Sequence, residues 1–283
     1  MTAPPTARRN DACRQPLGFW PGEAGVAMTS DSVRASSFEI LDTPMAIWQK
    51  SEPTFSATRE VLIGLGIYAI YMLVRKAVVT EAGEARALEN AQAVVDLERR
   101  VGIHVEPEIQ RAMLPYPRVL HVMSVAYATL NVGLTVGWLT RMFYKRDRRY
   151  AELRRATAYA TLGAMPFFLY FPCAPPRKLD HIVDTIADVS GIDLESPLLS
   201  RFYIPIAAMP SIHVTYAVVT GLGMAQTSSS AAIRGLGRLY TPLVAFIVFA
   251  TGNHYVLDGA LGAAIGWITL RLARLSPRRM GAR

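Results

Sequence analysis

Charge is scarce in this chain of 283 residues, and it is unevenly distributed. Only 18% of the residues are charged and 51% are hydrophobic, whereas a soluble domain usually carries about 25% charge. No Asp, Glu, Lys or Arg occurs from Val119 to Thr140 or from Phe202 to Ile233. A charge-free apolar run of about 18 or more residues is typical of a transmembrane helix. Several such runs separated by basic clusters argue against one large soluble core, so we expect a membrane protein.

Cysteine is also rare. Cys13 and Cys173 lie far apart without ligand-like neighbours, which excludes a disulfide framework and gives no support to a cysteine-based zinc site. The formal net charge is +8, but the basic residues are not interleaved with aromatic ones as on a surface for single-stranded nucleic acid. We therefore expect no nucleic-acid partner and use the basic residues as topology signals.

The chain divides into a tail, a membrane domain and a second tail. Residues 1–58 lack periodicity and predict a disordered tail, 59–275 predict the membrane domain, and 276–283 form a short basic tail. The domain is expected to be an all-α bundle of six transmembrane helices. These spans cover residues 60–79, 119–140, 156–171, 209–226, 239–251 and 255–272.

Two further helices are expected between the first two spans. Residues 80–103 place apolar side chains on one half of a helical wheel, with Glu98 intruding, which predicts an interfacial or docked helix. Residues 106–111 predict a short helix that Pro115 and Pro117 end.

Basic loops predict the orientation of the bundle. Residues 141–155 contain seven Lys or Arg, the predicted polar turn 227–238 contains two more, and the C-terminal tail is basic. By the positive-inside rule these segments and both termini face the cytoplasm. Residues 80–117, 173–208 and 252–255 then face outward.

This topology brings four ionisable residues to one depth near the outer face: Arg177, His213, His254 and Asp258. Such groups cost a few kcal/mol at membrane depth and usually mark a functional site. His254 and Asp258 are one helical turn apart, so the carboxylate can fix the imidazole tautomer and make the other ring nitrogen a better nucleophile or base. Such a pair can also merely stabilise a helix, but the shared depth with His213 and Arg177 favours function.

Two histidines, a carboxylate and a guanidinium suit phosphoryl chemistry. The planar fork of Arg177 matches phosphate oxygens, one histidine can attack phosphorus, and the other can protonate the leaving oxygen. Two histidines and one aspartate also suit zinc, but the adjacent arginine would repel a metal ion. We therefore expect neither a metal nor a cofactor in this site.

Three stretches resemble the signature segments of a known family. They are Ala174-Pro-Pro-Arg177, Met209-Pro-Ser-Ile-His213 and Asn253-His-Tyr-Val-Leu-Asp258. They look like those of the membrane type 2 phosphatidic acid phosphatase superfamily, especially the branch of inositol phosphorylceramide synthases and their bacterial relatives. The resemblance covers roughly residues 60 to 275 in segment order and spacing.

The resemblance implies a six-helix core, a metal-independent reaction on a lipid phosphate, and a location in a bacterial plasma membrane. It implies that His254 is the nucleophile, that Asp258 activates it, and that His213 is the general acid. It further implies that Arg177 holds the phosphoryl oxygens, with Ser211 in the same cradle.

The chain departs from the wider superfamily pattern at several positions. Ile212 replaces a glycine, Ile247 and Val248 replace a Ser-Arg pair, and Tyr170 replaces a lysine. Because fewer cations then surround the phosphate, Lys178 is a further candidate for phosphate binding. The same loss of cations motivates an alternative, a non-catalytic membrane scaffold or lipid-binding protein with a degenerate site. The lipid, the acceptor and the oligomeric state stay open.

Overall fold

The structure is a computed structural model that describes residues 55–275 apart from residues 195, 197 and 198. The described residues form helices and loops without a named strand; one isolated bridge joins Cys173 to Ala207. The prediction of an all-α protein is therefore confirmed. The predicted tail 276–283 and nearly all of the tail 1–58 lie outside the described residues.

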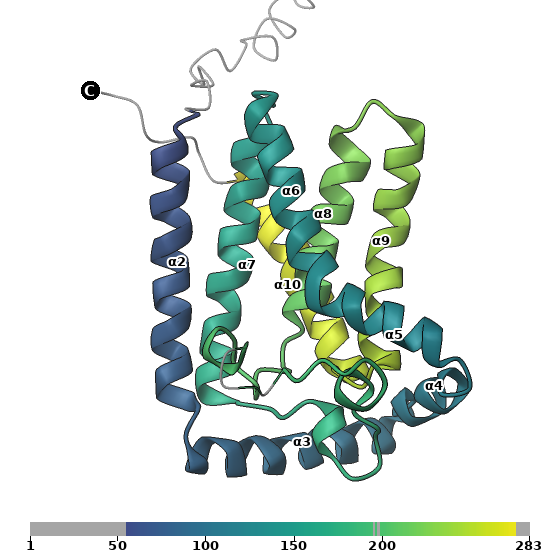
Figure 1. Cartoon of the computed structure of the whole chain (residues 1–283). Helices are drawn as coiled ribbons and strands as arrows, with labels where there is room; N and C mark the ends of the chain where they lie inside the picture. The colour runs from purple at the N-terminus through teal and green to yellow at the C-terminus, as the bar shows by residue number, and fades with distance from the viewer. Residues whose placement is uncertain (1–54, 195, 197–198, 276–283) are drawn as a thin grey trace, which may run out of the picture. The chain divides into compact units, whose positions relative to one another are not determined.

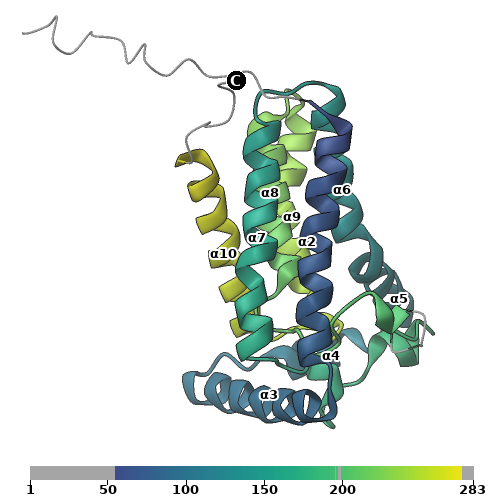
Figure 2. The same cartoon turned by 90° about the vertical axis from the view of Figure 1, so that its left-hand side faces the viewer.

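Long helices run side by side through the bundle (Figures 1 and 2). They are α2 (Ala57–Val78), the continuous path α5 (Pro117–Val125), η1 (Ala126–Leu130) and α6 (Asn131–Tyr144), then α7 (Tyr150–Tyr170), α8 (Ile212–Thr227), α9 (Ala231–Ala250) and α10 (Val256–Leu275). Four segments are long and apolar enough to cross a membrane, namely α2, Pro117–Tyr144, α9 and α10. The chain is therefore a membrane protein, while the count of six spans remains a prediction.

Several predicted boundaries differ from the observed ones. Most of the expected polar turn 227–238 belongs to α9, which begins at Ala231 because the Ser230 hydroxyl accepts a hydrogen bond from the Ile233 amide. The short helix α4 ends at Met113, before Pro115 as predicted, and Pro117 opens α5, since a proline at the first helical position loses no hydrogen bond. The segment 209–211 precedes α8, and Ser211 is its N-cap.

One helix lies across an end of the bundle in both views (Figures 1 and 2), namely α3 (Glu81–Val101), and α4 (Glu106–Met113) follows it. The buried residues of α3 are Ala87, Ala91, Val94, Val95 and Glu98. Three apolar residues of the predicted apolar half, Leu88, Leu97 and Val101, are instead exposed. The buried face of α3 includes Glu98, whose carboxylate accepts a hydrogen bond from the Leu257 amide.

Close backbone packing holds the start of α8 against α10. A side chain at Gly262 would collide with the carbonyl of Ser211, so only glycine permits this approach. The Ser211 amide donates to the Asp258 carbonyl over 3.1 Å, and the Thr215 hydroxyl donates to the Gly262 carbonyl over 3.0 Å. These contacts fix the register of the two helices that carry the histidine motifs.

Candidate active site

A tight turn places His254 immediately before α10. Gly252 has a φ of 68°, a left-handed conformation that favours glycine. A Cβ there would also lie 2.7 Å from the Ile182 Cγ2 atom. The Gly252 carbonyl accepts a hydrogen bond from the Arg177 amide over 2.8 Å. The turn therefore holds the Arg177 loop next to Asn253, the residue before His254.

The surroundings of His254 define its tautomer. Its Nδ1 lies 3.0 Å from the Ala208 carbonyl oxygen and 3.1 Å from Asp258 Oδ2. Because a carbonyl only accepts hydrogen bonds, Nδ1 carries the hydrogen and Nε2 carries the lone pair. Burial lowers the pKa of His254 to about 3; the Ala208 hydrogen bond opposes this change and the Arg177 charge adds to it. His254 is thus a neutral imidazole at physiological pH, as a nucleophile must be.

His213, the second residue of α8, lies beside His254, with 5.5 Å between the ring centroids. Tyr127 stacks on His213 at 4.2 Å. Asn131 supports this helix from α6, since its side-chain amide donates to the His213 carbonyl and accepts from the Tyr240 hydroxyl, each over 2.9 Å. Asn131 thus links α6 to α8 and α9.

One nitrogen of the His213 ring needs a partner. Its Nδ1 is buried and makes no hydrogen bond with the residues that the structure describes. A buried polar atom of this kind is costly unless a bound group or water satisfies it. His213 Nδ1 is therefore available to a bound group or a water molecule.

Arg177 is tied to the His254 turn by its side chain as well as its backbone. Its Nε donates to Asn253 Oδ1 over 3.1 Å, and its Nη1 pairs with Asp184 Oδ2 over 2.8 Å. The side chain is 5% exposed. The predicted convergence of Arg177, His254 and His213 is present in the structure, since all three line the same cavity.

That cavity has a volume of ≈ 960 Å³ and extends along the bundle. Its polar end contains Arg177, His213 and His254. Away from this end most lining residues are apolar or aromatic and come from α2, α6 and α7. Among them are Ile63, Gly64, Ile67, Val132, Val136, Leu139, Ala158, Met165 and Phe168. A polar head and a long apolar body would both find matching surroundings.

Three predicted site residues lie off the cavity lining. Asp258 is fully buried behind His254, where it contacts Nδ1. Ser211 is also fully buried, and its hydroxyl accepts from the Val214 amide over 3.3 Å as the N-cap of α8. Lys178 follows Arg177 in a short 3₁₀ turn.

Two residues near the site had no assigned role in the sequence interpretation. Tyr127 lies in η1, a π-helical turn of the kind often found at functional sites. Asp184 holds the Arg177 guanidinium from seven residues further along the same loop. Neither position follows from a local sequence signal, because a π-helical turn and a folded loop depend on the packing around them.

Fold and site together define an all-helical membrane protein in which two histidines lie at the polar end of an apolar cavity. A family model described as the PAP2 superfamily matches residues 92–272. The chain belongs to the PAP2 superfamily. This membership indicates a phosphatase-type enzyme that acts on lipid phosphates. No curated protein matches the chain, and no solved structure does so either.

Proposed function

We propose that the protein is a metal-independent phosphotransferase or phosphatase that forms a phosphohistidine on His254. The observation that carries this proposal is the hydrogen bonding of His254 Nδ1 to Ala208 and Asp258 beside His213. This hydrogen bonding leaves the lone pair of His254 on Nε2, and His213 places a second imidazole beside the His254 ring. We further propose that Arg177 binds the phosphoryl oxygens, because it lines the same cavity as both histidines and its Nε donates to Asn253, the neighbour of His254.

The reaction proceeds in two balanced steps. In the first, His254 Nε2 attacks phosphorus, the N–P bond forms, and the bond to the leaving oxygen breaks as His213 protonates that oxygen. In the second, water or an alcohol attacks the phosphohistidine, His213 accepts its proton, and the N–P bond breaks. Asp258 stabilises the positive charge that develops on the His254 ring, as a carboxylate behind a catalytic imidazole does.

The cavity supports a lipid as the carrier of the phosphate. Lining residues extend along α7 from Phe168 to Tyr150, which at 1.5 Å per residue is about 27 Å. This length accommodates an acyl or polyprenyl chain, with the phosphate at the histidines. Candidate substrates are phosphatidic acid, a polyprenyl phosphate or pyrophosphate, and a phosphoinositol lipid. We place the site at the outer membrane face and both termini in the cytoplasm, in a six-span topology.

Trapping of the intermediate tests the mechanism. Purified protein is incubated briefly with a lipid carrying a ³²P-labelled phosphate and then quenched in alkali, in which phosphohistidine survives. We expect acid-labile label on wild-type protein and none on His254→Ala. Label on His254→Ala would overturn the assignment of the nucleophile, and a protein that neither takes up label nor turns over any lipid phosphate would support the non-catalytic alternative.

The second step determines whether the enzyme is a hydrolase or a transferase. Water and a lipid hydroxyl are both candidate acceptors, and the resemblance of the three motifs to inositol phosphorylceramide synthases is the reason to include the lipid hydroxyl. Competing acceptors decide this point. With a phosphomonoester donor, a new phosphomonoester of a ceramide or a diacylglycerol indicates transfer, whereas release of inorganic phosphate alone indicates hydrolysis. With a phosphoinositol lipid as donor, the corresponding products are a new phosphodiester and free inositol phosphate.

A further inference from the structure

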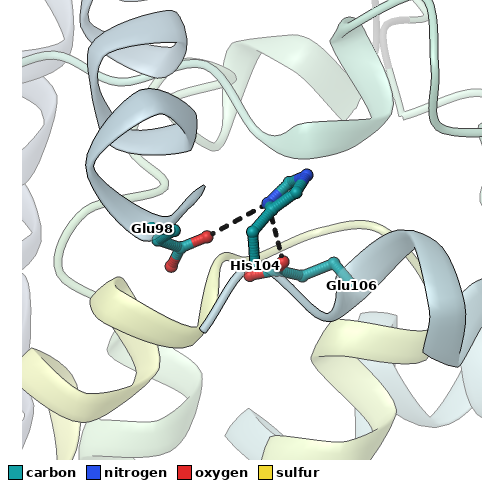
Figure 3. Close-up of side chains that lie close together, drawn as sticks. All are labelled: Glu98, His104 and Glu106. Carbon is teal, nitrogen blue, oxygen red and sulfur yellow. Dashed lines mark hydrogen bonds and ion pairs between the residues drawn. The ribbon is translucent and has the colours of Figure 1, made fainter. Parts of the chain in front are cut away.

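A second histidine–carboxylate cluster lies at the same end of the bundle, outside the proposed catalytic group. It consists of Glu98 near the end of α3, His104 in the following link and Glu106 at the start of α4 (Figure 3). His104 Nδ1 lies 3.4 Å from Glu98 Oε2 and 3.1 Å from Glu106 Oε2. One ligand atom from each residue lies within 4.8 Å of the other two. The three side chains therefore present one nitrogen and two oxygens to a common point.

Backbone hydrogen bonds fix the direction of both carboxylates. Glu98 Oε1 accepts from the Leu257 amide over 2.7 Å, and Glu106 Oε1 accepts from the Val256 amide over 2.6 Å. Each carboxylate thus uses one oxygen to cap the first turn of α10 and turns the other toward His104. Metal-binding carboxylates are commonly oriented by hydrogen bonds of this kind.

The two carboxyl groups of the cluster are buried. The side chains of Glu98 and Glu106 are 0% and 1% exposed, and that of His104 is 11% exposed. Glu106 Oε2 is buried and accepts no hydrogen bond within the described part of the chain, although His104 lies within ion-pair distance of it. Two buried carboxyl groups facing one imidazole are costly unless a proton or a cation compensates their charge. A divalent cation would bind all three groups and neutralise both carboxylates.

We infer that Glu98, His104 and Glu106 form a divalent-cation site, with zinc as the ion that fits the donor set best. Zinc takes imidazole nitrogen and carboxylate oxygen at about 2.0–2.2 Å, so neighbouring ligands in a tetrahedral shell lie about 3.3–3.6 Å apart. The separations of 3.1 and 3.4 Å at His104 are close to this range. The ion would join the end of α3 and the start of α4 to the first turn of α10, the helix that follows His254. This inference does not depend on the proposed reaction.

Metal content measures the site directly. Full-length protein without a histidine tag is stripped with EDTA, loaded with zinc, manganese or magnesium, desalted, and analysed by mass spectrometry for metal. We expect about one equivalent of retained zinc. Thermal unfolding should show a midpoint about 5–10 °C higher at a zinc concentration 100-fold above the dissociation constant.

Matched variants assign the zinc to this cluster. His104→Ala and Glu106→Gln should lose both the retained zinc and the rise in midpoint. Two nearby variants should keep them: His181→Ala, whose ring lies 5.9 Å from that of His104, and Glu108→Gln on an exposed part of α4. His254→Ala should keep zinc as well, which separates this site from the catalytic group.

Three outcomes would overturn the inference. The first is a wild-type protein that retains no zinc, and the second is zinc retention in His104→Ala equal to that of the wild type. Should His104→Ala not fold, X-ray absorption at the zinc edge of the wild type still decides. One imidazole among oxygen ligands supports the site, whereas two imidazoles would overturn the ligand set of Glu98, His104 and Glu106.

Discussion

Two histidine–carboxylate groups surround the start of α10, and they differ in what their polar atoms face. In the catalytic group, the Nδ1 side of His254 is held by Ala208 and Asp258, and the ring lines a cavity of ≈ 960 Å³. The second group consists of Glu98, His104 and Glu106 and is called the α3–α4 group below. Its two carboxylates accept hydrogen bonds from backbone amides of α10, and none of its three residues lines that cavity. Similar side chains therefore line a cavity in one place, where we propose that they serve a reaction, and hold a helix in another.

Removal of the nucleophile should have the largest effect. We expect His254→Ala to lower turnover at least ~10³-fold, since loss of a covalent nucleophile removes the whole pathway. The folded protein should persist, because a smaller side chain at the end of the cavity leaves the helix contacts in place. Phosphate release or diester formation from a lipid phosphate measures this, with the unfolding midpoint as the control for folding. Turnover of His254→Ala within tenfold of the wild type would show that His254 is not the nucleophile, and the two groups would then not differ in catalytic role.

Loss of the general acid should be severe but dependent on the substrate. His213→Ala should lower turnover by ~10² to 10⁴-fold with an ordinary lipid alcohol as the leaving group. A substrate whose leaving group is a nitrophenol needs no protonation, so most of that loss should disappear. An equal loss with both substrates would show that His213 positions the phosphate instead of donating a proton.

Substitutions in the α3–α4 group should lower stability more than turnover, the reverse of what we expect for the two histidines. Glu106→Gln weakens a charge-assisted hydrogen bond to the Val256 amide, which should cost about 2 kcal/mol of unfolding free energy. Turnover per folded molecule should fall less than tenfold, because the variant leaves the cavity lining unchanged. The matched variant Glu108→Gln lies two residues along the same helix, where its carboxylate is 62% exposed, and should be nearly neutral. Equal stability of the two variants would contradict the role of Glu106 as a clamp on α10.

The contrast between the groups also shows how far the sequence could be interpreted. The i,i+4 spacing of His254 and Asp258 and the basic loops were sufficient to predict that Arg177, His213 and His254 meet, and the structure places all three on one cavity. Glu98 was predicted only as an intrusion on an apolar helix face, because the group that it bonds is the distant backbone amide of Leu257. A long-range hydrogen bond to a backbone amide leaves no trace in spacing or composition.

Acid should destabilise the fold through His254. Its pKa is about 3 in the folded protein, against an ordinary value of 6.5 for a solvated histidine, so the unfolded chain binds more protons between these values. Stability gained from the neutral ring is therefore present above pH 6.5 and is lost as the pH falls toward 3. His254→Gln should show a smaller drop in unfolding midpoint over this interval than the wild type. Parallel curves for the two proteins would show that His254 does not titrate in this way.

Filling the cavity should have the smallest effect on activity, and it should leave the α3–α4 group unchanged. Gly64 and Gly66 both lie on α2, and a Cβ at either position meets nothing within 4 Å, but only Gly64 lines the cavity. Gly64→Leu should raise the KM for a long-chain lipid phosphate about 3- to 10-fold, since burying fewer methylene groups of the chain costs roughly 0.8 kcal/mol each. A short-chain substrate should be unaffected, and so should zinc binding by the α3–α4 group. Gly66→Leu gives the same gain in helix propensity without entering the cavity, so an equal rise in KM for that variant would show that the lipid chain lies elsewhere.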